Sequence, residues 1–296
     1  MPLPNVIIAG APRCGTTSLF RWAAAHPEVI TSRIKETRYL IDKGYPLYSP
    51  RHNFATHGVE GYARLFPDRG GAGKRVYLEA TPDYLYQHTA RRVLADLPTK
   101  PVTIFLLRNP VERMLSLFQY AMNNVGSLHG RYSLRDCLVA ARDGVPLGDA
   151  IIDSAFAHSV YHTWLEKWIA EVGRSRTVVY FFDDLVSDPG SLMRDFCHQV
   201  KIDTGFYEKF TFKPQNQSYT VRSTLLARAK WAARKFLPAN VPTRALFKVY
   251  RAINVRDDVR PIVVDADLLR ELRDRFAEPN LRLAELLGRD LPKNWD

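Results

Sequence analysis

Residues 6–20 constrain the fold of this chain more than any other stretch. An unbroken apolar run ends at Gly10, Gly15 follows, and two threonines and a serine then begin a helical pattern. This order predicts a buried β-strand, a tight turn and a helix N-terminus. In such a turn, backbone N–H groups and the positive end of the helix dipole face an anion. The segment therefore predicts a loop that binds a phosphate-like group.

The cation of this loop distinguishes it from the P-loop of nucleotide triphosphatases. Their P-loop carries a Lys directly before the Ser or Thr that ligates magnesium. Here Thr16 occupies the position of that Lys, and Arg13 supplies a cation from within the turn. We therefore expect a phosphate-like ligand rather than a magnesium–triphosphate, and we favour this site over an ordinary βα turn. The expected binding residues are Arg13, Cys14, Gly15, Thr16, Thr17 and Ser18.

Apolar runs and helical patterns alternate along the first two thirds of the chain. The apolar runs predict strands at residues 5–9, 76–78, 102–107 and 177–182. The amphipathic patterns predict helices at residues 16–25, 59–66, 89–97, 110–123, 151–172 and 191–200. This alternation predicts an α/β, P-loop-like fold of three layers. Helices flank a central, mainly parallel sheet, and ligands bind at the carboxyl ends of its strands.

The carboxyl-terminal part, from about residue 211, is basic and helical in pattern. Its predicted helices span residues 225–237, 243–253, 266–276 and 280–287. Surface loops are predicted at residues 44–58 and 123–131. No linker is long enough to separate independent domains, so we expect residues 1–296 to form a single domain.

The net charge of +11 predicts an anionic partner. Ten Lys or Arg residues lie between positions 222 and 260, against only two aspartates. No nucleic-acid-binding module is recognisable, so we expect a polyanionic cofactor or substrate and no nucleic acid. The pattern at residues 225–237 leaves peripheral contact with an anionic membrane or glycan open. For residues 225–237 we slightly favour a helix that packs on the core and exposes its basic face to solvent over such a contact.

Cysteine usage and the amino terminus predict a cytoplasmic protein. Three cysteines in unlike contexts argue against a disulfide framework. The first predicted strand begins at once, which leaves no room for a signal peptide, and every apolar run is too short to span a bilayer. His158 and His162 lie four residues apart on one predicted helix but have no third ligand in the pattern. We therefore expect these histidines to pack rather than to bind a metal.

A second anion motif follows the apolar run at residues 102–107. The run leads into Arg108, Asn109 is suited to cap a helix, and Pro110 suits the first helical position. Ser116 lies on this predicted helix, where an arginine fork and a hydroxyl together suit a terminal phosphate. If this motif is considered alone, a surface arginine and a neutral helical serine are a better interpretation of it than a phosphate site.

Together these stretches resemble the sulfotransferases that use 3′-phosphoadenosine 5′-phosphosulfate (PAPS), most of all the bacterial and heparan-sulfate-type branch. Residues 12–18 resemble the family's 5′-phosphosulfate loop, and the pattern from Arg108 to Ser116 resembles its 3′-phosphate motif. Residues 35–40 resemble its Lys-Glu-x-x-aromatic segment, and residues 79–84 its Glu-Lys-Ser/Thr-Pro-x-Tyr segment. Segments that fit the rest of the family pattern follow in the same order at residues 159–168, 178–189, 216–218 and 280–295.

The resemblance implies a PAPS-dependent sulfotransferase that needs no metal and releases adenosine 3′,5′-bisphosphate (PAP). It implies that the loop around Arg13 holds the 5′-phosphosulfate and that Arg108 and Ser116 hold the 3′-phosphate. It further implies that a segment containing Arg222 closes over the nucleotide. The sequence does not identify the acceptor; we expect a hydroxyl, with a saccharide favoured over a lipid or polyketide and a peptide tyrosine last.

The resemblance also implies that Glu36 is the general base, with Lys35 and Arg38 orienting it or the donor. Glu79 is the second candidate for the base. Ala80 stands where many glycan-acting members place a Lys, which weakens the inference of a heparan-like acceptor. The expected catalytic residues are Glu36, Arg13 and Lys35.

Two other functions remain open on the sequence. A P-loop-type small-molecule kinase would use the Phe182-Asp-Asp184 segment for magnesium, but it would lack the P-loop Lys. A non-enzymatic binder of anionic glycan or membrane would use the tract at residues 222–260. The oligomeric state stays open as well.

Overall fold

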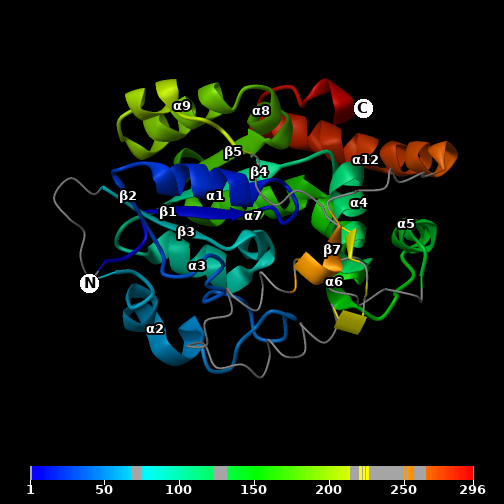
Figure 1. The fold of residues 1–296 in the computed structure, drawn as a ribbon, viewed down its shortest axis with the longest axis horizontal. Coiled ribbons are helices and arrows are strands. Elements are labelled where there is room, and N and C mark those ends of the chain that lie inside the picture. Colours follow the sequence, from blue (N-terminus) through cyan, green and yellow to red (C-terminus); the bar gives the residue numbers. More distant parts are fainter. Residues whose placement is uncertain are drawn as a thin grey trace. The chain divides into compact units, whose positions relative to one another are not determined.

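A parallel β-sheet, as the alternating pattern predicts, forms the centre of the computed structural model (Figure 1). The structure describes residues 2–67, 75–122, 132–213, 220–221, 223, 225–226, 250, 252–256 and 265–295. Among these residues, the sheet has five strands in the order β2-β3-β1-β4-β5, all parallel. The strands are β1 (Val6–Gly10), β2 (Val29–Thr31), β3 (Val76–Ala80), β4 (Val102–Leu107) and β5 (Thr177–Phe181).

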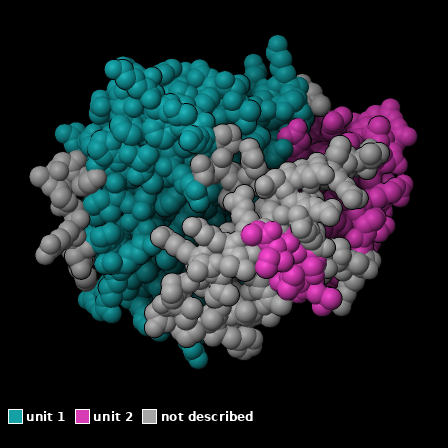
Figure 2. All heavy atoms as spheres, viewed as in Figure 1, with its two compact units in different colours: residues 1–109, 160–216, 279–295 teal, residues 110–159, 217–278, 296 magenta. Residues whose placement is uncertain are grey.

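The described residues form two compact units (Figure 2). Unit 1 comprises residues 1–109, 160–216 and 279–295 and contains the whole sheet. Unit 2 comprises residues 110–159, 217–278 and 296. The expectation that residues 1–296 form a single domain stays a prediction.

Helices complete unit 1 around the sheet, which confirms the predicted α/β class. They are α1 (Thr16–Ala25), α2 (Phe54–Ala63), α3 (His88–Asp96), α7 (Tyr161–Val172), α8 (Phe182–Ser187) and α9 (Pro189–Val200). Short 3-10 helices accompany them as η1 (Pro82–Tyr86), η4 (Arg174–Arg176), η5 (Gly205–Lys209) and η6 (Lys293–Trp295).

Unit 2 contains mostly short helices. They are α4 (Pro110–Tyr120), α5 (Leu134–Asp143), α6 (Ala150–Asp153), η3 (Ala157–Ser159) and the first part of α12 (Ala266–Leu287). Two short antiparallel strands, β6 (Thr220–Val221) and β7 (Val255–Arg256), also belong to it. None of the helices among the described residues of either unit is long and apolar enough to cross a membrane.

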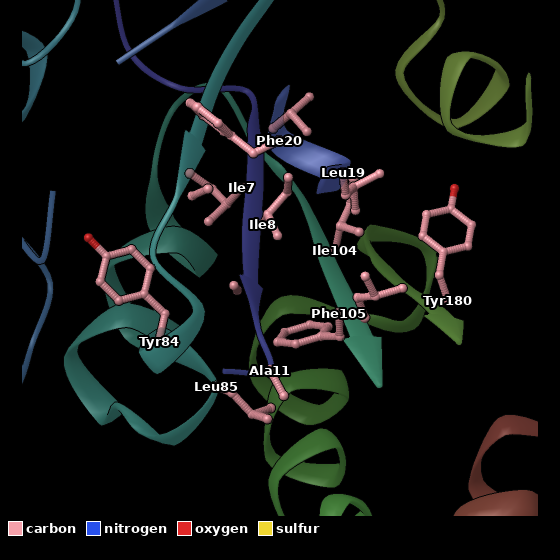
Figure 3. Close-up of a cluster of buried hydrophobic side chains, with 14 of the residues drawn as sticks. Ile7, Ile8, Ala11, Leu19, Phe20, Tyr84, Leu85, Ile104, Phe105 and Tyr180 are labelled. Carbon is pink, nitrogen blue, oxygen red and sulfur yellow. The ribbon is translucent and has the colours of Figure 1, made fainter. Parts of the chain in front are cut away.

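The core of unit 1 lies on both faces of the sheet, because successive side chains of a strand point to opposite faces. Ile104 of β4 lies beside Leu19 of α1 (Figure 3). The next residue, Phe105, points the other way and packs edge-to-face on Trp168 of α7, with ring centroids 5.0 Å apart. Both strand residues are fully buried. The central strands are thus covered on both faces, as their continuous apolar runs predict.

The largest differences from the predicted elements are a divided helix, two joined helices and a helix that begins inside a predicted loop. The helix predicted at residues 151–172 is divided into α6, η3 and α7. The carbonyl of Ala155 would accept the Ser159 N–H in a continuous helix, but it accepts hydrogen bonds from Arg113 Nη2 and Ser159 Oγ, both at 2.8 Å. The sequence also gives no periodic signal for β2, which has only three residues and is held by pairing with β3.

The two helices predicted at residues 266–276 and 280–287 are one helix, α12, that continues through Pro279. A proline removes one helical hydrogen bond. A stripe of buried residues nevertheless continues at helical spacing on both sides of it. The stripe consists of Leu268, Leu272, Phe276, Asn280, Leu283 and Leu287.

Helix α2 begins inside the segment predicted as a loop at residues 44–58. Asn53 caps it by accepting a hydrogen bond of 2.9 Å from the Thr56 N–H. The backbone is non-helical at Gly58, so the pattern predicted only the part of α2 that follows this interruption. The predicted loop at residues 123–131 and most of the basic helices at 225–253 lie outside the described residues.

Candidate active site

The predicted anion loop, residues 11–15, joins β1 to α1 as expected. Its first N–H, from Ala11, donates a hydrogen bond of 2.9 Å to the carbonyl of Leu106 in β4. Arg13 has a left-handed backbone, with φ of 72°, and its side chain is half-buried. The Cys14 N–H donates to the Ala11 carbonyl at 3.3 Å, which closes the loop on itself.

Gly15 is required at the end of this loop for two reasons. Its φ of 88° lies in the left-handed region, which side chains rarely adopt. A Cβ at this position would also lie 2.7 Å from Leu185 Cδ2 and 3.0 Å from a ring carbon of Phe182. The close approach of α8 to the loop therefore depends on glycine.

The N-terminus of α1 is suited to an anion. No side chain caps it, and its first turn contains no acidic residue. The positive end of the helix dipole is therefore not neutralised by a carboxylate of that turn. Thr16 and Ser18 are buried, Thr17 is half-buried, and the Ser18 N–H donates to the Gly15 carbonyl at 2.9 Å. The donor set fits the phosphate-like ligand that the loop sequence predicts.

The second predicted anion residue, Arg108, directly follows β4 in unit 1. Its guanidinium lies 4.5 Å from the ring centroid of Phe182. Its carbonyl accepts a hydrogen bond of 2.8 Å from the hydroxyl of Tyr161, which is buried and lies 3.8 Å from Cys14 Sγ. Tyr161 thus contacts both loops. Nothing in the sequence indicates this role beyond the place of Tyr161 in a family-like segment.

Ser116, the proposed partner of Arg108, is buried on α4 and belongs to unit 2. The joint phosphate site of these two residues stays a prediction. Arg113 of the same motif is fully buried, and its Nε donates a hydrogen bond of 3.0 Å to Ser159 Oγ. With its bond to the Ala155 carbonyl, Arg113 holds unit 2 together internally.

Glu36 lies at the carboxyl end of β3, because its N–H donates a hydrogen bond of 2.8 Å to the carbonyl of Ala80. Its carboxylate contacts Lys35 Nζ at 2.7 Å and Arg38 Nη2 at 3.3 Å, and its side chain is 34% exposed. Burial raises the pKa of Glu36, but the two cations outweigh burial and hold it below the ordinary value. Glu36 is therefore an ionised carboxylate that solvent reaches.

Glu79, the second candidate for the base, is 0% exposed. Thr37 and Thr81 donate hydrogen bonds to its Oε1 at 3.0 and 2.6 Å, and Tyr62 donates to its Oε2 at 2.9 Å. Burial raises the pKa of Glu79, although these hydroxyl donors act against that rise. Thr81 falls in the motif recognised at residues 79–84, whereas nothing in the sequence connects Tyr62 with this carboxylate.

The loop after β1, the Glu36 turn at the end of β3 and Arg108 after β4 all lie at one edge of the sheet. The three strands are neighbours and parallel, so their carboxyl ends meet there. The strand order also reverses at β1, which is where ligands bind in open α/β sheets. Unit 1 thus carries two cationic segments and an ionised carboxylate at its expected ligand-binding edge.

One of the two carboxylates in the Phe182-Asp-Asp184 segment, which a kinase would use for magnesium, has other partners. Asp183 accepts hydrogen bonds from Asn294 Nδ2 at 2.7 Å and from Trp295 Nε1 at 3.3 Å. Asp183 therefore anchors η6 to the end of β5. No group of three or more His, Cys, Asp or Glu residues suited to a metal occurs among the described residues.

The two predicted helical histidines are not on one helix. His158 belongs to η3 and His162 to α7, and both are buried. Burial, together with the charge of Arg113, lowers the pKa of His158 to about 3. His158 is thus a neutral packed side chain. Arg222 lies outside the described residues, so its predicted contact with the nucleotide stays a prediction.

Residues 3–236 match the family described as the sulfotransferase domain. The chain therefore belongs to the sulfotransferase domain family, a family of transferases, which confirms the membership that the ordered motifs predict.

Relatives of known name are similar over most of this chain. The bifunctional heparan sulfate N-deacetylase/N-sulfotransferase 4 of Mus musculus is 22% identical over 266 residues, which cover 86% of this chain and 29% of the relative. The bifunctional heparan sulfate N-deacetylase/N-sulfotransferase 1 of Homo sapiens is 22% identical over 256 residues, which cover 83% of this chain and 28% of the relative. This chain thus spans less than a third of the length of these relatives.

The crystal structure of a sulfotransferase from Alicyclobacillus acidocaldarius has the same fold. It superimposes with a TM-score of 0.70 at 21% sequence identity, and the match covers 100% of this chain and 99% of the other. The comparison confirms the predicted fold class, with a central parallel sheet flanked by helices.

Proposed function

We propose that this protein transfers a sulfuryl group from PAPS to an acceptor hydroxyl. The observation that carries the proposal is that the uncapped α1 N-terminus, Arg108 and the ionised Glu36 lie at the carboxyl ends of neighbouring parallel strands. Membership of the sulfotransferase domain family supports the same reaction. Sulfuryl transfer, like phosphoryl transfer, depends mainly on positioning and on neutralising charge, and these segments are suited to both.

In this proposal the loop after β1 binds the 5′-phosphosulfate of the donor. The Arg13 guanidinium and the N–H groups of Gly15, Thr16 and Thr17 bind its oxygens, and the hydroxyls of Thr16, Thr17 and Ser18 add donors. Charge-assisted hydrogen bonds of this kind are stronger than hydrogen bonds between neutral groups. Arg108, Ser116 and Arg222 would bind the other end of the nucleotide, where a 3′-phosphate distinguishes PAPS from ATP.

Glu36 would accept the proton of the acceptor hydroxyl. The acceptor oxygen forms a bond to sulfur while the bond between sulfur and the phosphate oxygen breaks, and PAP leaves. Lys35 and Arg38 keep the carboxylate ionised, so it is ready to take the proton near neutral pH. Glu79 is a poorer candidate because both its oxygens are occupied and solvent does not reach it.

The acceptor that we favour is a saccharide hydroxyl, followed by a lipid or polyketide hydroxyl and then a peptide tyrosine. The names of the relatives from mouse and human refer to heparan sulfate, which supports a saccharide. Ala80, in place of the Lys of many glycan-acting members, weighs against heparan sulfate itself. Because the relatives are named N-sulfotransferases, an amino sugar belongs in any acceptor panel.

Calorimetry with PAP tests the proposal directly. We expect PAP to bind in the presence of a chelator as tightly as with magnesium, because side chains and backbone N–H groups supply the positive charge. Binding of ATP with magnesium, without binding of PAP, would favour the kinase. Heparin or acidic-vesicle binding without PAP binding would favour a non-enzymatic binder.

Radiolabelled PAPS identifies the acceptor. Polysaccharides, phenols, sterols and amino sugars would be incubated with the donor, and transfer of the label would be measured. If the protein binds PAP but transfers label to none of these acceptor classes, the proposed donor site is supported and the preference for a saccharide acceptor is contradicted.

A further inference from the structure

We infer that Glu79 is a positioning residue: its buried carboxylate holds the turn that presents Glu36 at the edge of the sheet. The importance of this role for catalysis rests on the proposed function, whereas the positioning itself is a property of the fold. Neither the family match nor the names of the relatives assigns a role to this carboxylate.

The turn at residues 36–38 has an unusual backbone. Glu36 and Arg38 have φ of 62° and 57°, in the left-handed region that non-glycine residues rarely adopt. Thr37, between them, is buried. Two left-handed residues separated by a single residue keep this backbone conformation only where contacts with the surrounding structure hold it. The turn therefore needs external support.

Glu79 supplies that support through two threonines. Thr37 Oγ1 donates a hydrogen bond of 3.0 Å to Glu79 Oε1 and so connects the middle of the turn to β3. Thr81 Oγ1 donates to the same oxygen at 2.6 Å, and the Arg38 N–H donates to Thr81 Oγ1 at 3.2 Å. One carboxylate oxygen thus holds the middle of the turn directly and its second left-handed residue through Thr81.

Two tyrosines complete the network. Tyr62 donates to the other oxygen of Glu79 at 2.9 Å. The hydroxyl of Tyr84 lies 3.1 Å from Thr37 Oγ1 and accepts the Leu40 N–H at 3.2 Å, which fixes the chain just after the turn. The Tyr62 hydroxyl therefore interacts with Glu79 and Tyr84, each of which contacts the turn, whereas Thr37 links the turn to Glu79 directly. This difference separates positioning from general stability.

Three variants test the inference. Thr37→Val removes the link but keeps the shape of the side chain, and Glu79→Ala removes the whole support. Glu79→Gln keeps an oxygen for the two threonines and an amide that can donate to the Tyr62 oxygen, but it cannot serve as a base. Tyr62→Phe is the matched control, because it removes one buried hydrogen bond of Glu79 and leaves the turn contacts in place.

The main measurement is the pKa of Glu36 by carbon-13 NMR of labelled carboxyl groups, with the resonance assigned from Glu36→Gln. In the intact protein this pKa lies below its ordinary value because Lys35 and Arg38 contact the carboxylate. We expect it to move toward that value in Thr37→Val and Glu79→Ala, and to stay low in Glu79→Gln and Tyr62→Phe. Binding of PAP, expected to stay within about twofold of the parent, reports that each variant folds.

Turnover with the acceptor found in the screen gives the second measurement. We expect kcat to fall about tenfold or more in Thr37→Val, and to stay within about threefold in Glu79→Gln. A loss in Glu79→Gln as large as in Glu36→Gln would make Glu79 a chemical base and overturn the inference. An unchanged Glu36 pKa in Thr37→Val would overturn it too, as would equal shifts in Thr37→Val and Tyr62→Phe. Failure of the proposed function would appear separately, as absent PAP binding in the parent protein.

Discussion

The hydroxyl of Tyr161 donates a hydrogen bond of 2.8 Å to the carbonyl of Arg108. The same oxygen lies 3.8 Å from the thiol sulfur of Cys14, and Tyr161 is 2% exposed. A single buried side chain of α7 therefore contacts the loop after β1 and the segment after β4. In the proposed enzyme these two segments bind opposite ends of one nucleotide, so their spacing has to match the length of that nucleotide.

Replacement of Tyr161 by Phe is expected to weaken PAP binding about three- to tenfold. The Arg108 carbonyl loses a hydrogen bond of a kind that contributes about 1 kcal/mol, and the two loops lose a shared contact. Calorimetry with PAP measures the change. Tyr207→Phe is a matched control, since the buried Tyr207 hydroxyl donates to the Trp22 carbonyl at 2.9 Å. An equal loss of affinity in both variants would show that Tyr161 acts through stability alone.

Replacement of Arg108 by Ala is expected to weaken PAP binding about 10- to 100-fold, because a charge-assisted interaction with the 3′-phosphate is lost. Arg176→Ala is the control, because Arg176 precedes β5, at the opposite edge of the sheet, and contacts the carbonyls of Leu94 and Ala95. Equilibrium binding of PAP compares the two variants. Parent-like affinity in Arg108→Ala would remove Arg108 from the site.

Replacement of Glu36 by Gln is expected to lower kcat about 100-fold or more, while the Kd of PAP changes about twofold at most. The amide keeps the shape of the side chain but does not accept the hydroxyl proton. Steady-state turnover of PAPS and calorimetry with PAP measure the two quantities. Glu171→Gln, at a carboxylate that pairs with Arg91 at 2.9 Å, serves as the control. Turnover near that of the parent would assign proton transfer to another group.

The pH dependence of kcat/KM is expected to reflect the lowered pKa of Glu36. The base works only when ionised, so its activity is complete above the ordinary value of 4.5 and falls as the pH drops through the lowered pKa. Lys35→Gln removes the nearer cation and raises this pKa. Its acid limb should therefore lie at higher pH than that of the parent. An acid limb at the same pH in both proteins would contradict the proposed electrostatic role of Lys35.

Replacement of Gly15 by Ala is expected to destabilise the protein by about 3 kcal/mol or more and to abolish PAP binding. The added Cβ meets both a left-handed φ of 88° and Leu185 at 2.7 Å. Gly144→Ala is the matched control, because Gly144 has φ of 71° but no atom within 4 Å of its Cβ position. That variant should lose only about 1–2 kcal/mol. Urea denaturation compares them, and equal losses would show that Gly15 matters only for its backbone angle.

Local signals predicted the elements that carry the site. The β1–loop–α1 unit and the start of α4 at Pro110 agree with the structure to within a residue. In both places the signal lies in consecutive residues: an apolar run, a glycine or proline, and a helix-forming stretch. The prediction of helix boundaries was wrong where side chains from distant parts of the sequence compete for backbone hydrogen-bond acceptors. Arg113 takes the Ala155 carbonyl from 42 residues away, and no pattern in residues 151–172 records that competition.

The sequence by itself determined which segments bear cations, carboxylates and a phosphate-type turn, because these properties belong to neighbouring residues. It gave Glu36 as the expected base and Glu79 as the second candidate. Only the tertiary structure shows how their surroundings differ, since the surroundings of a carboxylate depend on groups far along the chain. Tyr62 and Thr37, which lie 17 and 42 residues from Glu79, occupy its oxygens, while Lys35 and Arg38 hold Glu36 ionised where solvent reaches it. Folding brings these side chains together and so gives each carboxylate its own surroundings.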